Sequence, residues 1–283
     1  MSNSIVTYKP DNFIEKGYVS IFREIFLELK ENRWLTFQLF QRDFFAGYKQ
    51  SFFGICWTLV TPLMSVGTFI VLNKSGVFSV GEIGMPYPLY AIIGIAFWNL
   101  FSSGLASGSD ALVRAGNMLT KINFSKKSLV LASFGSSIVS FLIQLILALA
   151  LFAYYKILPA PGILFLPIVI VPILLLSLGL SFIFALLNSI MRDIGKALPM
   201  VLTFLMFLTP VLYGKPKAGI LLHITQYNPL YYFVSEARSL VLTGTMTTTE
   251  IKGFFFSWLG ALGIFIVGLV LFHLTEKRIA ERI

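Results

Sequence analysis

Few side chains in this sequence could carry out covalent chemistry or bind a metal ion. The chain has one cysteine, Cys56, and two histidines, His223 and His273, which lie far apart. One cysteine cannot form an intrachain disulfide, and three scattered residues do not have the spacing of a metal site. The sequence also lacks a Gly-x-x-x-x-Gly-Lys-Ser/Thr loop, a Gly-x-Ser-x-Gly elbow and a His-Glu-x-x-His motif. We therefore expect no catalytic residue, no metal and no cofactor held by this chain.

The distribution of charge predicts the elements that position these residues. The 283 residues are 57% hydrophobic and 12% charged, and the mean hydropathy is +0.83. A soluble domain has about 25% charged residues, and a disordered chain combines low hydrophobicity with high charge. Both classes are excluded, which leaves a protein embedded in a lipid bilayer.

Seven stretches of at least 18 residues contain no Asp, Glu, Lys or Arg. Six are apolar enough to cross a bilayer core about 30 Å thick, and they predict transmembrane helices at 52–72, 87–107, 129–155, 163–190, 198–212 and 254–273. The seventh, 218–235, is interrupted by polar residues and Pro229. Because broken backbone survives at membrane depth only under a protein or water cover, we interpret 214–249 as external re-entrant helices before the last span. The fold class is thus an all-α polytopic membrane protein.

Basic residues are unevenly divided between the two sides of this predicted bundle. The N-terminal region 1–50, the loops 110–127 and 192–196 and the tail from 276 carry 16 of the 22 Lys and Arg residues. The positive-inside rule places these segments, and both termini, in the cytoplasm. The net charge of +9 is spread over short loops rather than gathered on one soluble face, so nucleic acid is not an expected partner.

Residues 19–48 are predicted to form an amphipathic helix. Phe37, Phe40, Phe44 and Tyr48 recur at helical spacing, with basic residues between them. A helix with an aromatic face and a basic face lies in the headgroup plane. It could simply lie on the membrane or pack on the bundle. Alternatively it forms a cytoplasmic gate for an anionic lipid headgroup, with Arg42 and Lys49 as phosphate contacts.

The predicted spans contain almost no titrating side chain, His273 near one end being the exception. Carriers driven by ions need such groups near the membrane midplane, so uphill transport would take its energy from another polypeptide. The spans are instead rich in aromatic rings, which could stack on the apolar faces of sugars. The candidate channel-lining rings are Trp57, Phe69, Trp98 and Phe101; the alternative is that they are ordinary core or lipid-facing residues.

Several motifs resemble those of the membrane permeases of bacterial ATP-binding cassette (ABC) exporters for O-antigen, capsule and teichoic acid. The segment RDFFAGYKQSFFGICWTLVTPL at 42–63 resembles the entry to the first span of that family. Resemblance continues through YPLY at 87–90, NMLTKINF at 117–124 and Arg192-Asp193 after the fourth span. It ends with TPVLY at 209–213, NPL at 228–230 and Glu236 with Arg238. One departure is Ser125, where the family usually has proline, so the resemblance does not predict the local turn there.

The resemblance implies a six-span ABC type-2 permease that forms a homodimer in the bacterial inner membrane and pairs with two copies of a separate cytoplasmic ABC ATPase. ATP and Mg would bind to that ATPase, and the cargo would be an undecaprenyl-type lipid-linked polysaccharide, as in lipopolysaccharide biosynthesis. The resemblance divides the chain into a cytoplasmic region 1–50 and a permease domain 51–283, with a coupling loop at 113–127.

The same resemblance, together with the aromatic and basic patterns, assigns candidate roles to individual residues. Substrate entry is expected at Arg42, Tyr48 and Lys49. Coupling to the ATPase is expected at Arg114, Asn117, Lys121 and Phe124. The external gate region is expected to contain Tyr213, Asn228, Pro229, Glu236 and Arg238. Glu236 and Arg238 are two residues apart and do not share a helix face, so each should have its own polar partner.

Two other functions are compatible with the sequence. The permease could carry another cargo, such as teichoic acid, a drug, a lipid or a peptide. It could also be a membrane-embedded glycolipid enzyme, but such an enzyme needs clustered acidic or basic side chains at one face. The predicted external acids are only Glu82, Glu236 and Glu250, and the long aromatic N-terminal helix favours a glycan cargo.

Overall fold

The computed structural model describes residues 18–48, 53–75, 83–116 and 125–279, and every regular element in these ranges is helical. The helices are α2 (Tyr18–Glu31), α3 (Arg33–Tyr48), η1 (Gly54–Cys56), α4 (Trp57–Lys74), α5 (Tyr87–Ser109), α6 (Ala111–Ala115), α8 (Lys126–Tyr154), η2 (Pro161–Phe165), α9 (Leu166–Ile190), α10 (Asp193–Leu208), α11 (Ile220–Tyr227), α12 (Pro229–Leu242) and α13 (Ile251–Ile279). The predicted all-α fold class is confirmed.

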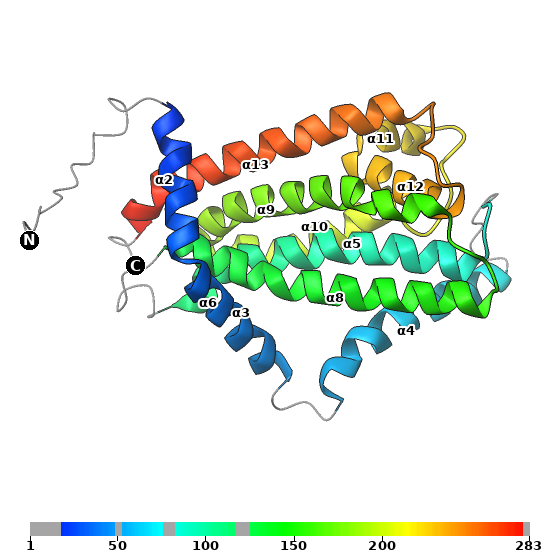
Figure 1. Ribbon diagram of the computed structural model, residues 1–283, viewed down its shortest axis with the longest axis horizontal. Helices are drawn as coiled ribbons and strands as arrows, with labels where there is room; N and C mark the ends of the chain where they lie inside the picture. Colours follow the sequence, from blue (N-terminus) through cyan, green and yellow to red (C-terminus); the bar gives the residue numbers. More distant parts are fainter. Residues whose placement is uncertain (1–17, 49–52, 76–82, 117–124, 280–283) are drawn as a thin grey trace, which may run out of the picture.

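Four helical segments are long and apolar enough to cross a membrane. They are Tyr87–Ser109, Lys126–Tyr154, Pro161–Ile190 and Ile251–Glu276, and they match four of the six predicted spans. They run side by side along the long axis of the molecule (Figure 1). Many large apolar side chains on their outer faces are exposed, which is the pattern expected where lipid replaces water as the solvent.

The other two predicted spans, 52–72 and 198–212, correspond to the shorter helices α4 and α10. α4 has 18 residues and contains Pro62, while α10 has 16 residues. At 1.5 Å per residue, α10 is about 24 Å long, which is less than the ~30 Å hydrocarbon core. α4, the helix of the first predicted span, also begins later than predicted, at Trp57, because residues 54–56 form the tighter 3-10 turn η1.

The predicted bounds of the fifth span were wrong at both ends. α10 begins at Asp193, so most of the predicted loop 192–196 is helical, and the helix ends at Leu208 rather than 212. The end has a local cause. Thr209 precedes Pro210, and the ring of a proline drives the preceding residue out of the helical region. Thr209 accordingly has an extended backbone, with φ −99° and ψ 130°.

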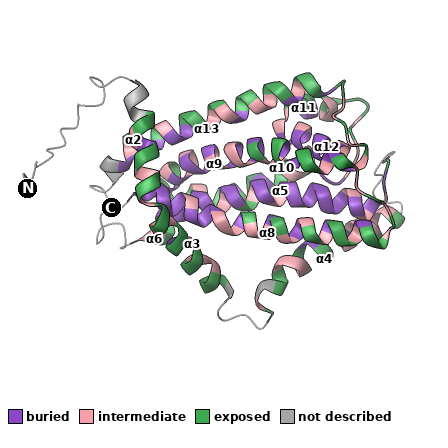
Figure 2. Ribbon diagram, in the orientation of Figure 1, coloured by how far each residue is buried: buried purple, intermediate pink, exposed green. Residues whose placement is uncertain are grey.

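α5 is the central helix of the bundle. It packs against α8 on one side and α9 on another, and most of its length is buried (Figure 2). α9 also packs against α13, where Gly179 and Gly268 face each other. A Cβ atom on Gly268 would lie 2.2 Å from the carbonyl oxygen of Gly179. Small residues let two helix backbones approach closely, so these glycines set the α9–α13 spacing.

The single predicted helix at 19–48 is wrong, because the chain forms two helices that run in different directions (Figure 1). The break is at Asn32. Its Nδ2 donates to the carbonyl oxygen of Glu28 at 2.9 Å, and that oxygen also accepts the backbone N–H of Asn32 at 3.0 Å. Asparagine disfavours helix interiors because its side chain competes for backbone groups in this way.

α3 packs on α8 rather than lying apart from the bundle. The ring of Phe40 covers Gly135, where a Cβ atom would come within 2.4 Å of it. The rings of Trp34, Phe37, Phe40 and Phe44 follow one another with centroids 5.6–6.3 Å apart. The exposed surface of α2 and α3 combines Phe26, Trp34, Phe37 and Phe45 with Arg23, Lys30, Arg33 and Arg42. Aromatic and basic side chains therefore share the exposed surface of this bent pair of helices, and the predicted division into one aromatic and one basic face is not seen.

The bundle has two distinct ends, which can be followed in Figure 1. We call the end formed by α2, the start of α8 and the end of α13 the α2 end. The opposite end, formed by α11, α12 and the start of α13, is the α12 end. α12 packs against α13, α9 and α5, so the segment 214–249 folds back onto the bundle.

Candidate functional site

Arg238 is the most heavily bonded candidate residue at the α12 end. Its side chain is on α12 and is only 6% exposed. The guanidinium donates to the carbonyl oxygens of Pro210 and Tyr90, both at 3.1 Å, and to that of Val211. Its central carbon also lies 3.5 Å from the centroid of the Tyr90 ring. Burial lowers the pKa of Arg238 to about 10, so the group remains charged at neutral pH.

Two of the three carbonyl partners of Arg238 follow the end of α10, and the third belongs to Tyr90 on α5. Pro210 and Val211 lie beyond Leu208, the last residue of α10, so the break at Thr209-Pro210 leaves their carbonyl groups outside the helical hydrogen-bond pattern. Gly94 on α5 provides the space, because a Cβ atom there would lie 2.2 Å from Arg238 and 2.3 Å from the oxygen of Val211. Arg238 therefore ties α12 to both α5 and the end of α10.

Asn228 and Pro229 begin α12. The Oδ1 of Asn228 accepts the backbone N–H of Leu230 at 3.0 Å, and its Nδ2 donates to Oγ1 of Thr209 at 2.7 Å. Asparagine is a favoured N-cap residue, and Pro229 occupies the first helical position, where a missing N–H is harmless. This cap connects the start of α12 to the end of α10.

Tyr213 belongs to the same end of the bundle. Its hydroxyl donates to the carbonyl oxygen of Phe207 at 2.7 Å, and its own carbonyl accepts the hydroxyl of Tyr90 at 2.8 Å. The structure thus brings four of the five predicted gate residues, Tyr213, Asn228, Pro229 and Arg238, around the break between α10 and α12.

Glu236, the fifth predicted gate residue, is completely buried. Its Oε2 accepts the backbone N–H of Thr247 at 3.0 Å. Burial raises the pKa of Glu236 to about 7. Glu236 and Arg238 thus have separate partners, as their sequence spacing indicates.

A second acid, Glu250, was not among the predicted site residues. It accepts hydrogen bonds from Lys215 at 2.8 Å, from Ser235 at 2.9 Å and from the Tyr231 hydroxyl. Burial raises the pKa of Glu250, but these hydrogen bonds outweigh burial and leave it below the ordinary value. Its position as one of only two acids in 214–253, the other being Glu236, could have drawn attention to this residue from the sequence.

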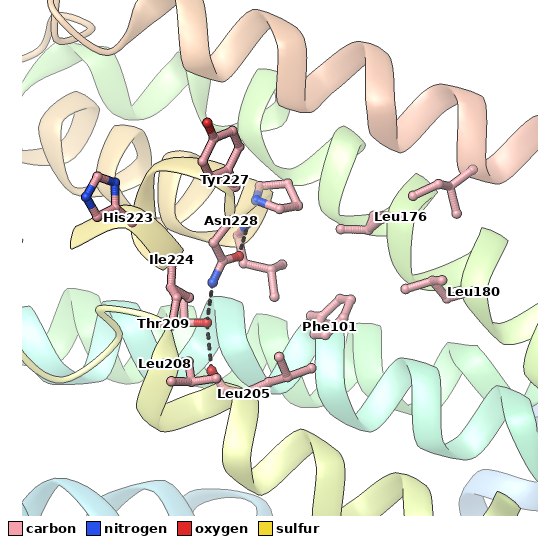
Figure 3. A pocket seen from close by; sticks show the side chains of 13 residues that line it. Phe101, Leu176, Leu180, Leu205, Leu208, Thr209, His223, Ile224, Tyr227 and Asn228 are labelled. Atoms are coloured by element: carbon pink, nitrogen blue, oxygen red, sulfur yellow. Dashed lines mark hydrogen bonds between the residues drawn. The ribbon is translucent and has the colours of Figure 1, made fainter. Parts of the chain in front are cut away.

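An apolar cavity of about 650 Å³ lies beside the Asn228 cap (Figure 3). It is formed by α5, α9, α10, α11, the start of α12 and α13, and its lining residues are Phe101, Leu176, Leu180, Leu205, Leu208, Thr209, His223, Ile224, Tyr227, Asn228, Pro229, Leu230 and Ile264. Figure 3 shows Asn228 and Thr209 bonded on one wall, with leucines of α9 facing them. Such a lining suits an apolar group rather than a reaction.

The four candidate channel rings are not brought together. Trp98 and Phe101 are buried in the chain, with ring centroids 5.8 Å apart, and Phe101 lines the cavity. Trp57 is half exposed at the start of α4 and packs edge-on against Phe53. Phe69 is half-buried against the core.

The predicted substrate-entry residues lie at the end of α3. Arg42 is exposed and forms an ion pair with Asp43 at 2.7 Å. Tyr48 is the last residue of α3, and Lys49 lies outside the described residues. An exposed ion pair of this kind contributes little to stability.

The predicted coupling loop 113–127 is helical at both described ends. Its first residues belong to α6, where Arg114 is exposed and donates to the carbonyl oxygen of Ser107 at 2.6 Å. Asn117, Lys121 and Phe124 lie outside the described residues. Ser125, the departure from the resembled family, has φ −63°. Proline also adopts this angle, so the turn can keep the same backbone with serine.

A buried cluster of opposite charges also lies at the α2 end, and the sequence analysis did not predict it. Lys127 is fully buried and contacts the carboxylates of Glu28 and Glu276. The three residues come from α8, α2 and α13. No short-range pattern could have revealed this cluster, because its members are about 100 or more residues apart in the chain.

Together, these features define a polytopic α-helical membrane protein whose buried polar groups join helices. The chain matches the ABC-2 type transporter family over residues 34–242, and it belongs to that family.

Comparison with individual proteins gives the same class. The chain is 29% identical to the O-antigen export system permease protein RfbA of Myxococcus xanthus over 187 residues, covering 66% of this chain and 70% of the relative. It is 24% identical to a protein of the same name from Klebsiella pneumoniae over 262 residues, covering 90% of this chain and 98% of the relative. The resemblance noted from the motifs is therefore confirmed at the level of the family.

Proposed function

We propose that this chain is the transmembrane subunit of an ATP-driven ABC exporter that moves a lipid-linked polysaccharide such as O-antigen across the bacterial cytoplasmic membrane. The observation that carries the proposal is the match to the Klebsiella pneumoniae RfbA permease, which extends over 98% of that protein. The lack of charged residues in the predicted spans supports it, because such a bundle has no means of ion coupling.

In this proposal the bundle has six spans, with α4 and α10 added to the four long helices. α11 and α12 are external re-entrant helices, and both termini are cytoplasmic, in agreement with the excess of basic residues at the α2 end. Two copies of the chain form the channel, and two copies of a cytoplasmic ATPase supply ATP and Mg²⁺. The short length of α10 suits a helix that is covered by other helices rather than by lipid alone.

The α12 end has the construction of an external gate. Arg238 and Asn228 attach α12 to α5 and to the end of α10 through directional hydrogen bonds. A shift of α10 is therefore transferred to α12 without unfolding either helix. Tyr213 and Pro229 complete this hinge region, while Glu236 holds the far part of α12 to Thr247.

The proposed substrate entrance is the C-terminal part of α3. Arg42 and Tyr48 belong to the last two turns of α3, which carries exposed aromatic side chains that suit the headgroup layer, and Lys49 follows them in the sequence. Arg114, Asn117, Lys121 and Phe124 belong to the segment that would dock on the ATPase. Trp57, Phe69, Trp98 and Phe101 are the aromatic rings assigned to the glycan path.

A deletion strain tests the cargo. Cells without this chain are expected to lose surface polysaccharide and to accumulate the lipid-linked glycan inside, and a plasmid copy should restore export. Loss of a teichoic acid with intact O-antigen would assign a different glycan. Unchanged surface glycans of every kind would contradict the proposal.

A further inference from the structure

The apolar cavity beside the Asn228 cap extends from the α12 end deep into the bundle. Three of its lining residues, Phe101 on α5, Leu180 on α9 and Ile264 on α13, lie about 14 residues after the first residue of their helices. All three helices begin at the α12 end (Figure 1). At 1.5 Å per residue, the cavity reaches about 20 Å along the bundle. Because half of a ~30 Å hydrocarbon core is about 15 Å, this depth matches one leaflet of a bilayer.

The two ends of the cavity differ in polarity. His223 and Tyr227 of α11 line one end, and both side chains are exposed, Tyr227 by 87%. Figure 3 shows His223 and Leu180 on opposite sides of the cavity, with Leu176 and Phe101 near Leu180. Tyrosine is enriched at the membrane–water interface, and an imidazole N–H can donate a hydrogen bond. The cavity therefore suits a ligand with a polar head and a long apolar tail.

The polar atoms in the middle of the cavity wall already have partners. Nδ2 of Asn228 donates to Oγ1 of Thr209, and Oδ1 of Asn228 accepts the N–H of Leu230. The Thr209 hydroxyl donates to the carbonyl oxygen of Leu205 at 2.8 Å. A sugar ring here would leave its own hydroxyls unpaired, which is costly, and apolar cavities do not hold water. The volume of about 650 Å³ is nevertheless typical of ligand sites, which measure roughly 300–1,000 Å³.

The size of the cavity also argues against two larger occupants. An α-helix with its side chains is about 10 Å wide, so this volume would hold only about one and a half turns of a helix from a second copy. The undecaprenyl-type tail of the proposed cargo is much longer than one leaflet is deep. The walls also lie next to lipid, because the outer faces of α10 and α13 carry exposed apolar side chains such as Phe204, Phe207 and Val267.

We propose that this cavity binds one acyl chain of a membrane phospholipid, with the polar head at His223 and Tyr227 and the tail against Leu180, Phe101 and Ile264. The lipid belongs to the leaflet at the α12 end, which is the external leaflet in the proposed orientation. The site goes beyond the proposed function, because binding requires neither the ATPase nor a glycan. The bound chain supplies the packing contacts that an empty cavity lacks, and so supports the junction of α10 with α12.

A photocrosslinker in the cavity identifies the occupant. Leu180→p-benzoylphenylalanine places the reactive ketone at the deep end. Leu187→p-benzoylphenylalanine is the matched control, since Leu187 is also on α9 but is 41% exposed. The full chain is reconstituted in vesicles of phosphatidylethanolamine and phosphatidylglycerol that also contain lipid-linked polysaccharide. It is then extracted and washed in mild detergent and irradiated, and the adducts are identified by mass spectrometry.

The phospholipid adduct is expected to be about tenfold more abundant at Leu180 than at Leu187, because a lipid held in a site dissociates more slowly than one on the surface. Leu176→Trp, which fills the cavity, should lower the Leu180 adduct about tenfold, whereas Leu187→Trp should not. An adduct with a second copy or with the lipid-linked polysaccharide, or a phospholipid yield at Leu180 no greater than at Leu187, would overturn the proposal. These outcomes do not involve export, so they are separate from a failure of the proposed function.

Discussion

Replacing Arg238 by methionine is expected to loosen α12 from the bundle. The substitution keeps an unbranched apolar stem but removes three hydrogen bonds to carbonyl oxygens and the contact with the Tyr90 ring. A buried hydrogen bond contributes a net ~1 kcal/mol, and a cation–π contact contributes about 1 kcal/mol. The expected loss in the free energy of unfolding is therefore about 4 kcal/mol.

The loss can be measured as a fall in the melting temperature of the detergent-purified protein. One kcal/mol corresponds to about 2–4 °C for a domain of this size class, so Arg238→Met should melt about 10 °C below the wild type. Arg238→Lys should recover only part of the loss, since an ammonium lacks the planar fork that reaches several carbonyls. Lys217→Met, at an exposed position of the same segment, is the control. A melting temperature of Arg238→Met within about 2 °C of the control would refute this reasoning.

Three further outcomes are expected. Because the pKa of Glu236 is raised to about 7, the folded state binds more protons than the unfolded state between about pH 4.5 and 7. The free energy of unfolding should therefore fall as pH rises through this window, and Glu236→Gln should flatten this pH dependence. The prediction would be contradicted if the melting temperatures of the wild type and of Glu236→Gln changed equally with pH. Asn228→Ala should lower the free energy of unfolding by about 1–2 kcal/mol, because α12 loses its N-cap. Amide hydrogen exchange should then become faster at residues 230–232 but not in α9. Charge reversal at Arg42 or Lys49 should lower export at normal protein abundance, and unchanged export would exclude a phosphate contact.

The long spans could be predicted from the sequence because their signal is local. α5, α8, α9 and α13 each coincide with an apolar stretch that lacks charged residues. Prolines also stand at two helix starts, Pro86 before α5 and Pro161 at the beginning of η2 before α9. Length and composition alone therefore position the framework of the bundle.

The helix boundaries that were predicted wrongly also have local causes, but counting apolar residues does not detect them. The end of α10 depends on the backbone restriction that Pro210 imposes on Thr209. The bend between α2 and α3 depends on a side-chain hydrogen bond of Asn32, although the aromatic periodicity continues through it.

The partners of the buried charges could not be predicted at all. Arg238 bonds to backbone carbonyls, which have no sequence signature, and two of these carbonyls are available only because α10 ends early. Lys127 meets acids 99 and 149 residues away, so only the packing of α2, α8 and α13 brings the cluster together. The predicted gate residues were placed near one another by motif resemblance, but their bonding follows from the tertiary fold.

The most direct test of the central claim is glycan translocation in proteoliposomes that contain this chain, its ATPase and a labelled lipid-linked polysaccharide. The account predicts that the glycan reaches the opposite leaflet only when both proteins and ATP are present, and that a hydrolysis-deficient ATPase abolishes movement. Translocation by this chain alone, or by the complete complex without ATP hydrolysis, would contradict it.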